Sequence, residues 1–191
     1  MPVISNPQQV AAIYEQAAAR GLCLANFCTS NVYTTEAILR AAYEFGQQYQ
    51  LAGVPVVVSA TANYPIESQL VSYTSLRDAG LGMRALVDDV MRLAGQNSPY
   101  ADLAVMLHLD HGQPEADDAL FEWAAEFYAT IMYDASDWPL ELNIEMTRRF
   151  VERMRGRVLV EGAVAEIAQA VEHADDPLTT PEDAERFYNE T

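Results

Sequence analysis

DLAVMLHLDHG, residues 102–112, joins a run of apolar residues to a group of polar side chains. The compact run 102–109 is typical of a strand that is buried on both faces of a parallel sheet. His108, Asp110 and His111 stand at its carboxyl end. Because ligands of parallel α/β folds bind at the carboxyl ends of the strands, this stretch predicts both the fold class and the place of a site.

Strands and helices alternate along the rest of the chain. Short apolar runs predict further strands, and apolar residues at helical spacing predict the helices between them. About five such units predict a parallel sheet with right-handed crossovers, whereas a closed eightfold barrel normally needs about 250 residues. The segment 63–82 is expected to be irregular. The expected strands are 22–27, 54–59, 102–109, 129–133 and 157–161, and the expected helices are 7–20, 34–50, 83–95 and those beginning at Pro114, Pro139 and about Thr180.

The composition predicts a soluble domain with a strongly negative surface. The chain has 191 residues, 50% of them hydrophobic, and a formal net charge of −17. This charge excludes nucleic acid and anionic membranes as partners, because both would be repelled. No apolar run approaches the roughly 20 residues that span a bilayer. The first twenty residues also lack the basic and apolar regions of a signal peptide, so we expect a cytoplasmic protein.

Cys23 and Cys28 are the two cysteines of the chain. Their separation of five residues directs them to opposite faces of an extended segment, so a disulfide between them is not expected. Reduced thiols fit a cytoplasmic protein, and we expect both side chains to lie in the core.

The polar group that follows the run 102–109 allows two interpretations. Imidazole and carboxylate side chains are what a divalent-metal site with an adjacent general acid/base requires. The same residues also fit a strand end with solvated side chains. Strand parity places His111 opposite His108 and Asp110, unless the chain turns after Leu109. The sequence has no glycine-rich nucleotide loop, nucleophile elbow or CxxC pair, which removes those signatures.

Four sets of segments carry longer motifs. They are NFCTSN (26–31) with AILRAA (37–42), PVVV (55–58) with Thr61, LHLDHG (107–112), and IMYDAS (131–136) with Pro139, Glu141 and Asn143-Ile144. In this order they resemble the AFNVNN…AILEAA, PVIhQxS, hLDHG and hMhDgS…PhEENI motifs of the class II, metal-dependent fructose-bisphosphate and tagatose-bisphosphate aldolases. The resemblance extends over essentially the whole chain.

The resemblance implies an α/β (β/α)8 TIM barrel of which residues 1–191 supply about the first five βα units as a single, incomplete domain. It implies a lyase of carbohydrate metabolism and glycolysis. Such an enzyme reversibly cleaves a phosphorylated ketose, of the fructose- or tagatose-bisphosphate type, to dihydroxyacetone phosphate and an aldehyde. The implied cofactor is a divalent metal, usually zinc, which stabilises the enediolate. The implied partner is a small sugar phosphate.

Roles for individual residues follow from the matched motifs. Asp110 would donate and accept the proton at the hydroxyl of the aldehyde half, and His111 would be a metal ligand. Asp134 and Glu161 would belong to the metal site. Thr61 would contact the substrate or its phosphate, and Asn31 would line the substrate pocket. Each of these residues follows a predicted strand, which agrees with the strand-end rule.

The departures from the family pattern lie near the C-terminal end. The family's VExELG segment is here Val160 to Ala165, so Glu161 is kept but Ala163 replaces a second acid. Residues 187–191 resemble the stretch before the sixth strand. The family's two later metal histidines and its glycine-rich phosphate loop would therefore lie beyond them, and His173, in an acidic loop, is a poor substitute.

A second hypothesis follows from these departures. The protein would then be a catalytically incomplete, aldolase-like scaffold that binds a ligand or partner. An open five-unit sheet would expose two strand edges and an apolar face, which predicts self-association. Family members are commonly dimers or tetramers, so we also expect a homo-oligomer.

Overall fold

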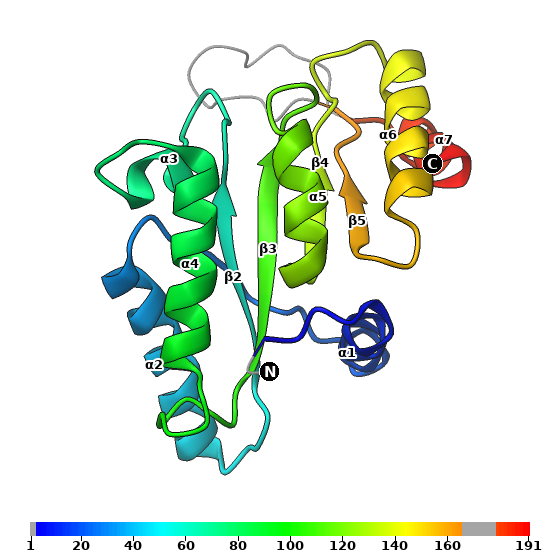
Figure 1. The fold of residues 1–191 in the computed structure, drawn as a ribbon. Coiled ribbons are helices and arrows are strands. Elements are labelled where there is room, and N and C mark those ends of the chain that lie inside the picture. Colours follow the sequence, from blue (N-terminus) through cyan, green and yellow to red (C-terminus); the bar gives the residue numbers. More distant parts are fainter. Residues whose placement is uncertain (1–2, 166–178) are drawn as a thin grey trace.

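The computed structural model describes residues 3–165 and 179–191. Its centre is a parallel sheet of five strands in the order of the sequence, which confirms the predicted α/β class. Each strand pairs in parallel with the next (Figure 1). The strands are β1 (Asn26–Cys28), β2 (Pro55–Thr61), β3 (Ala104–Gly112), β4 (Thr130–Tyr133) and β5 (Leu159–Gly162).

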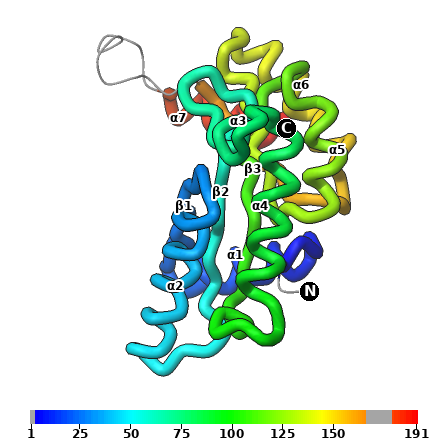
Figure 2. Tube along the Cα trace, turned by 60° about the vertical axis from the view of Figure 1, so that its left-hand side comes forward, coloured from blue at the N-terminus to red at the C-terminus, as the bar shows by residue number. Residues whose placement is uncertain are grey.

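Helices cover one face of this sheet. Their apolar residues join those of the strands in one large core, in which Leu39, Leu86, Phe121 and Phe150 represent four different helices. Figures 1 and 2 show α2 and α4 side by side on this face. The helices are α1 (Pro7–Ala19), α2 (Val32–Tyr49), α3 (Gln69–Tyr73), α4 (Ala79–Leu93), α5 (Asp118–Phe127), α6 (Leu140–Met154) and α7 (Pro181–Glu190).

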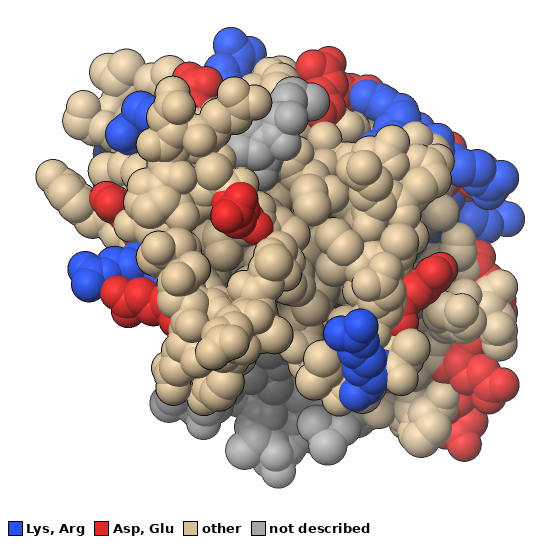
Figure 3. Space-filling model, turned by 90° about the horizontal axis from the view of Figure 1, so that it is seen from below, with Lys and Arg blue, Asp and Glu red and all other residues tan. Residues whose placement is uncertain are grey.

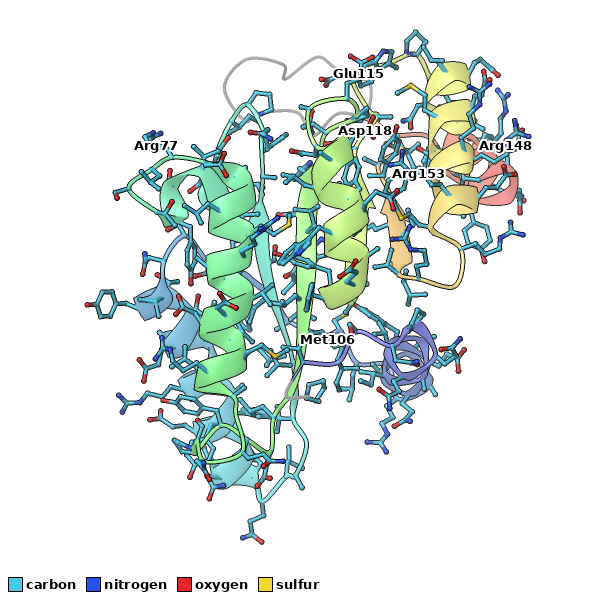
Figure 4. The ribbon with its side chains drawn as sticks, viewed as in Figure 1. Arg77, Met106, Glu115, Asp118, Arg148 and Arg153 are labelled. Carbon is cyan, nitrogen blue, oxygen red and sulfur yellow. The ribbon has the colours of Figure 1, made fainter. Side chains whose placement is uncertain are left out.

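Helix α1 lies apart from the other helices, near the end of the sheet where the strands begin (Figure 1). Val10 of α1 is fully buried and packs with Val57, Met106 and Ala129, one residue from each of three chain segments at the sheet. Figure 4 shows Met106 low on β3, at the level of α1. Seen from this end, most atoms belong to uncharged residues, and charged side chains lie mainly toward the rim (Figure 3).

The first strand differs from its prediction. The structure has only Asn26–Cys28 as β1, and all three residues are exposed, whereas 22–27 was expected to be buried on both faces. In the part of the chain that the structure describes, β1 pairs with β2 alone, so it is an edge strand. The predicted core position of the two thiols is wrong for the same reason, because Cys23 and Cys28 are both exposed.

The segment expected to be irregular is partly helical. It contains α3 and the beginning of α4, whose first turn is capped by Asp78 through a 2.7 Å hydrogen bond from the Leu81 amide. Gly82 permits these two helices to touch, because a Cβ at this position would lie 1.9 Å from the Leu70 carbonyl oxygen. The helix expected from Pro114 begins only at Asp118, after a turn held by the buried Asp117 carboxylate.

Helices α5 and α6 are joined at the surface by ion pairs. Arg153 lies 3.3 Å from Asp118, and the two side chains point toward each other in Figure 4. Arg157 and Glu122 pair at 2.7 Å. These groups are half exposed, so each pair contributes little, on the order of 0–1 kcal/mol. The apolar contact between the helices, where the rings of Phe121 and Phe150 pack edge to face with centroids 4.8 Å apart, makes the larger contribution.

Helix α7 closes over the last strand of the sheet. Its Phe187 is buried, and a Cβ at Gly162 would lie 2.7 Å from the Phe187 ring. Gly162 therefore leaves the space into which α7 packs. The guanidinium of Arg186 also binds the Glu141 carboxylate of α6. Among the described residues, no helix is long and apolar enough to cross a membrane.

Two tyrosines, the half-buried Tyr73 and the fully buried Tyr128, differ in how their hydroxyl groups are satisfied. Tyr73 donates to Asp89 at 2.9 Å and lies 3.3 Å from the Thr35 hydroxyl. The hydroxyl of the fully buried Tyr128 has no hydrogen-bond partner within residues 3–165 and 179–191. A buried hydroxyl without a hydrogen bond destabilises the folded state. The Tyr128 hydroxyl therefore lowers the free energy of unfolding, whereas the hydrogen-bonded Tyr73 hydroxyl raises it.

We predict that Gly82→Ala destabilises the protein, although alanine has the higher helix propensity. The new Cβ would collide with a backbone oxygen, and shifting α3 away from α4 should cost about 1–3 kcal/mol or more. Gly80→Ala is the matched control in the same helix, since its Cβ would meet atoms no closer than 3.4 Å. It should be neutral or stabilise by up to about 1 kcal/mol. Urea unfolding measures both, and equal effects would contradict the close packing.

We predict that Tyr128→Phe leaves the free energy of unfolding unchanged or raises it, because the variant removes an unsatisfied polar group. Tyr73→Phe should instead cost about 1–2 kcal/mol, because it removes the hydrogen bond that the phenol donates to Asp89 and its contact with the Thr35 hydroxyl. Thermal unfolding followed by circular dichroism compares the two. A loss of more than about 1 kcal/mol in Tyr128→Phe would refute this assignment of the hydroxyl.

Candidate active site

The strand β3 ends in an irregular turn that changes the direction of its side chains. The register between β3 and β4 shifts between Leu109 and Gly112. His111 lies in the left-handed region with φ 46°, a conformation that few non-glycine residues adopt. The chain therefore does turn after Leu109, and strict strand parity does not hold for His111. Strained backbone of this kind gathers at functional sites.

Gly112 makes this turn possible. A Cβ at Gly112 would lie 2.5 Å from the Phe121 ring and 2.9 Å from the carbonyl oxygen of Met132. Because Gly112 has no side chain, β3 resumes its pairing with β4 directly after the irregularity, where Gly112 is the register partner of Tyr133. The glycine that ends the LHLDHG motif is thus required by packing.

The His111 ring is held from two sides. Its Nδ1 donates to Asp134 Oδ2 at 2.5 Å, and its plane stacks on Tyr64 with ring centroids 4.3 Å apart. The other oxygen of Asp134 accepts from the Ser136 hydroxyl at 2.6 Å and from the Ser136 amide at 3.1 Å. The ring nitrogen that remains for a metal or a ligand is Nε2.

Electrostatics within this pair favour the ionised forms. The hydrogen bond to Asp134 raises the pKa of His111, although burial opposes the shift. Burial alone would raise the pKa of Asp134, but the hydrogen bonds from His111 and Ser136 outweigh it and hold the pKa below its usual range. A carboxylate bound to the far nitrogen of a histidine is the usual way in which proteins orient a metal ligand.

Asp110 lies between a side chain of its own strand, His108, and Cys28 at the end of β1. Its Oδ1 is 3.6 Å from His108 Nε2, and its Oδ2 is 3.7 Å from the Cys28 sulfur. Burial would raise the pKa of Asp110, but the contact with His108 and the charge of His111 outweigh it, so the pKa lies below the ordinary value. Asp110 is therefore a carboxylate at neutral pH, ready to accept a proton.

Thr61 and Asn31 take part in local hydrogen bonds at the same end of the sheet. Thr61 is the register partner of Asp110, and its hydroxyl donates to the Glu67 carbonyl and accepts from the Gln69 amide at 3.1 Å. Asn31 caps α2 by accepting from the Thr34 amide at 3.0 Å. Both residues therefore shape the loops of the site, and neither is drawn into the contacts of Asp110 or His111.

Glu161 and Ala163 lie at the end of β5. The Glu161 side chain is 61% exposed and lies 4.0 Å from His108 Nε2. Ala163, which stands where the family pattern has an acid, is buried, and its carbonyl accepts from the Asn143 side chain at 2.7 Å. Asn143 also receives a 3.0 Å hydrogen bond from Thr147, so α6 fixes the backbone that follows β5.

The structure thus brings four of the predicted residues toward one another: His111 bonds to Asp134, and Asp110 and Glu161 both face Nε2 of His108. Sequence reasoning did not identify Cys28, Tyr64 or Thr130 as neighbours of this group. Cys28 could have been found, since it ends a strand and replaces an asparagine of the family motif. The contact between Tyr64 and His111 depends on a loop path that no pattern revealed.

The described residues do not form a complete metal site by themselves. In residues 3–165 and 179–191, no three or more His, Cys, Asp or Glu side chains are grouped so that they could hold a metal ion. His111 is the one predicted ligand whose orientation suits the role. His173 lies outside the described residues.

Comparisons with known proteins agree with this fold and these motifs. The family model "Fructose-bisphosphate aldolase class-II" matches residues 8–191. A fructose-bisphosphate aldolase of Thermus caldophilus is 30% identical over 185 residues, which are 94% of this chain and 52% of that protein. One of Streptococcus pneumoniae (strain TIGR4) is 29% identical over 148 residues, 77% of this chain and 42% of the relative. The chain spans about half the length of the curated relatives that it matches.

Solved structures show the same architecture. The crystal structure of fructose-bisphosphate aldolase from Campylobacter jejuni superposes with a TM-score of 0.72 at 19% identity, over 98% of this chain and 54% of that one. The YdjI aldolase of Escherichia coli K12 gives 0.65 at 21% identity, over 93% and 56%. The five-stranded sheet is therefore part of a TIM barrel, as predicted, and the chain belongs to the class II fructose-bisphosphate aldolase family.

Proposed function

We propose that this protein acts in the reversible aldol cleavage of a phosphorylated ketose, of the fructose- or tagatose-bisphosphate type, to dihydroxyacetone phosphate and an aldehyde. The observation that carries the proposal is the turn at the end of β3, which sets the Asp110 carboxylate beside a histidine oriented by Asp134. Family membership supports the same reaction. We propose that the protein acts in carbohydrate metabolism, as a glycolytic enzyme of the cytoplasm.

Asp110 is the group that we assign to proton transfer. In the cleavage direction its carboxylate takes the proton of the hydroxyl on the aldehyde half while the carbon–carbon bond breaks and the electron pair stays on the ketone half. In the condensation direction it returns that proton. The lowered pKa keeps this group ionised, so it is free to accept a proton, and His108 and Cys28 contact the carboxylate at the strand end.

The family uses a divalent metal, and we propose zinc for this protein. The described residues offer one oriented ligand, His111 through Nε2, with Asp134 holding the ring and Glu161 nearby. Because they do not gather a full ligand set, we derive no step through the metal from them. When bound, such an ion polarises the ketone and stabilises the enediolate.

The substrate is a sugar phosphate, which we propose to be contacted by Thr61 and Asn31 at the loops that follow β2 and β1. The 191 residues include no lysine, since all eleven basic residues are arginine. Covalent aldol chemistry through a lysine Schiff base is therefore not open to the residues of this chain. The treatment of residues 1–191 as one incomplete domain, and the homo-oligomer, stay predictions.

The second candidate function is a catalytically incomplete scaffold that binds a ligand or partner. Two observations favour it: the buried Ala163 in place of an acid, and the missing ligand set among the described residues. The two candidates differ in metal content. A catalyst should hold the ion at one equivalent per chain, and a scaffold should not.

We predict that Asp110→Asn lowers kcat for the cleavage of fructose- or tagatose-bisphosphate by about 10²- to 10⁴-fold, because the amide cannot accept the proton. The enzyme should be purified from its natural source or expressed with its complete gene, and the rate measured as release of dihydroxyacetone phosphate. Asp102→Asn is the matched control, since Asp102 is exposed and precedes the same strand.

Three outcomes separate the alternatives. A strong loss in Asp110→Asn with an unchanged Asp102→Asn supports the assignment. A normal rate in Asp110→Asn shows that another group transfers the proton. Absence of both activity and stoichiometric metal in the wild-type protein, measured by elemental mass spectrometry, overturns the enzyme and favours the scaffold.

A further inference from the structure

His108 is a buried side chain that contacts Asp110 but takes no direct part in the proposed proton transfer. It is 3% exposed and lies on β3 between two neighbouring strands. Its Nδ1 is 2.7 Å from the hydroxyl of Thr130, its register partner on β4. Its Nε2 faces two carboxylates, Asp110 at 3.6 Å and Glu161 at 4.0 Å. Each ring nitrogen therefore has its own polar neighbours.

The polar contacts continue from Thr130 to the N-terminal helix. The hydroxyl of Tyr14 in α1 lies near the Thr130 side chain, and desolvation raises the pKa of Tyr14. The phenol therefore keeps its proton at neutral pH. A row of contacts thus begins at α1, crosses β4 and β3, and ends at Asp110.

When the His108 ring is neutral, one order of protons satisfies every group in this row. If Nδ1 of a neutral His108 carried the proton, the bare Nε2 would face two carboxylates, and acceptors facing each other repel. The proton therefore belongs on Nε2, where it points at Asp110 and Glu161. Nδ1 is then an acceptor for the Thr130 hydroxyl, and the Thr130 oxygen accepts in turn from Tyr14.

We propose that Tyr14, Thr130 and His108 form a hydrogen-bonded relay that fixes the Nε2–H form of His108 and thereby positions the Asp110 carboxylate. His108 and Thr130 are positioning residues in this scheme, because neither touches the reacting atoms. The relay makes α1 part of the active site at a distance, since the helix supplies its first donor. The Nε2–H form of the His108 ring does not depend on the reaction that the protein catalyses. Its effect on catalysis rests on the proposed function.

The proton form of the ring is measured directly by nuclear magnetic resonance. The chain has three histidines, so long-range ¹H–¹⁵N spectra of the labelled protein resolve each imidazole. In the neutral ring, we expect His108 as the Nε2–H form with Nδ1 as a hydrogen-bond acceptor. An Nδ1–H form would overturn the proposal, whether or not the protein is an aldolase.

Variants of Thr130 separate positioning from packing. Thr130→Val keeps the shape but removes the hydroxyl, so we expect the Nδ1 resonance to move toward that of a nitrogen without a hydrogen bond. In the active enzyme, kcat should fall by roughly five- to tenfold with little change in KM. Thr130→Ser keeps the hydroxyl and should restore most of kcat and the wild-type Nδ1 resonance. If packing alone mattered, valine would be the better replacement, and that result would overturn the relay.

Tyr14→Phe tests the far end of the row and does not alter β3 or β4. We expect a smaller shift of the Nδ1 resonance in the same direction, because Thr130 loses the donor that fixes its own hydroxyl. A wild-type spectrum in Tyr14→Phe would remove α1 from the relay. Absence of aldol cleavage in the wild-type enzyme would instead contradict the proposed function and leave the spectral result standing.

Discussion

The irregular turn at the end of β3 is the constraint on which the site depends. A regular strand would direct Asp110 and His111 to opposite faces of the sheet. The left-handed backbone of His111 costs on the order of 1 kcal/mol of stability. It allows the Asp110 carboxylate and the His111 imidazole to lie together at the end of one strand. Gly112 and Phe121 hold the turn from behind, so the packing of α5 preserves the geometry of the site.

The parallel sheet then decides which side chains meet. Because β2, β3 and β4 pair in register, Ser59, His108 and Thr130 lie in one row across the sheet. Thr61 and Asp110 form the next row toward the carboxyl end. Helix α1 seals the opposite end with Val10. The site is thus arranged in layers, in which a buried polar layer lies beneath the residues that would face a substrate.

Much of this arrangement could be predicted from the sequence. Apolar runs placed β2 to β5 within a few residues, since buried parallel strands are continuous and apolar. The first strand and its cysteines were predicted wrongly, because a composition typical of a buried strand does not reveal that the strand lies at an edge. Helix α3 was missed because its stability comes from packing against Gly82 and not from its own five residues. Motifs located Asp110, His111 and Asp134, whereas the partners Thr130 and Tyr64 depend on tertiary contacts.

The described residues provide more of the groups needed for proton transfer than of those needed for metal binding. Asp110 has a neighbour on each side, a lowered pKa and, through His108, a connected set of buried partners. Metal binding is represented by one oriented histidine, and the position that would add an acid is the buried Ala163. Proton transfer and metal binding therefore depend on different contacts at the same end of the sheet. The first depends on the row between β3 and β4, and the second depends on groups that these residues do not gather. A change in the His108 row should consequently alter proton transfer without altering how His111 is held, because His111 is fixed through Asp134 and Tyr64 and not through His108.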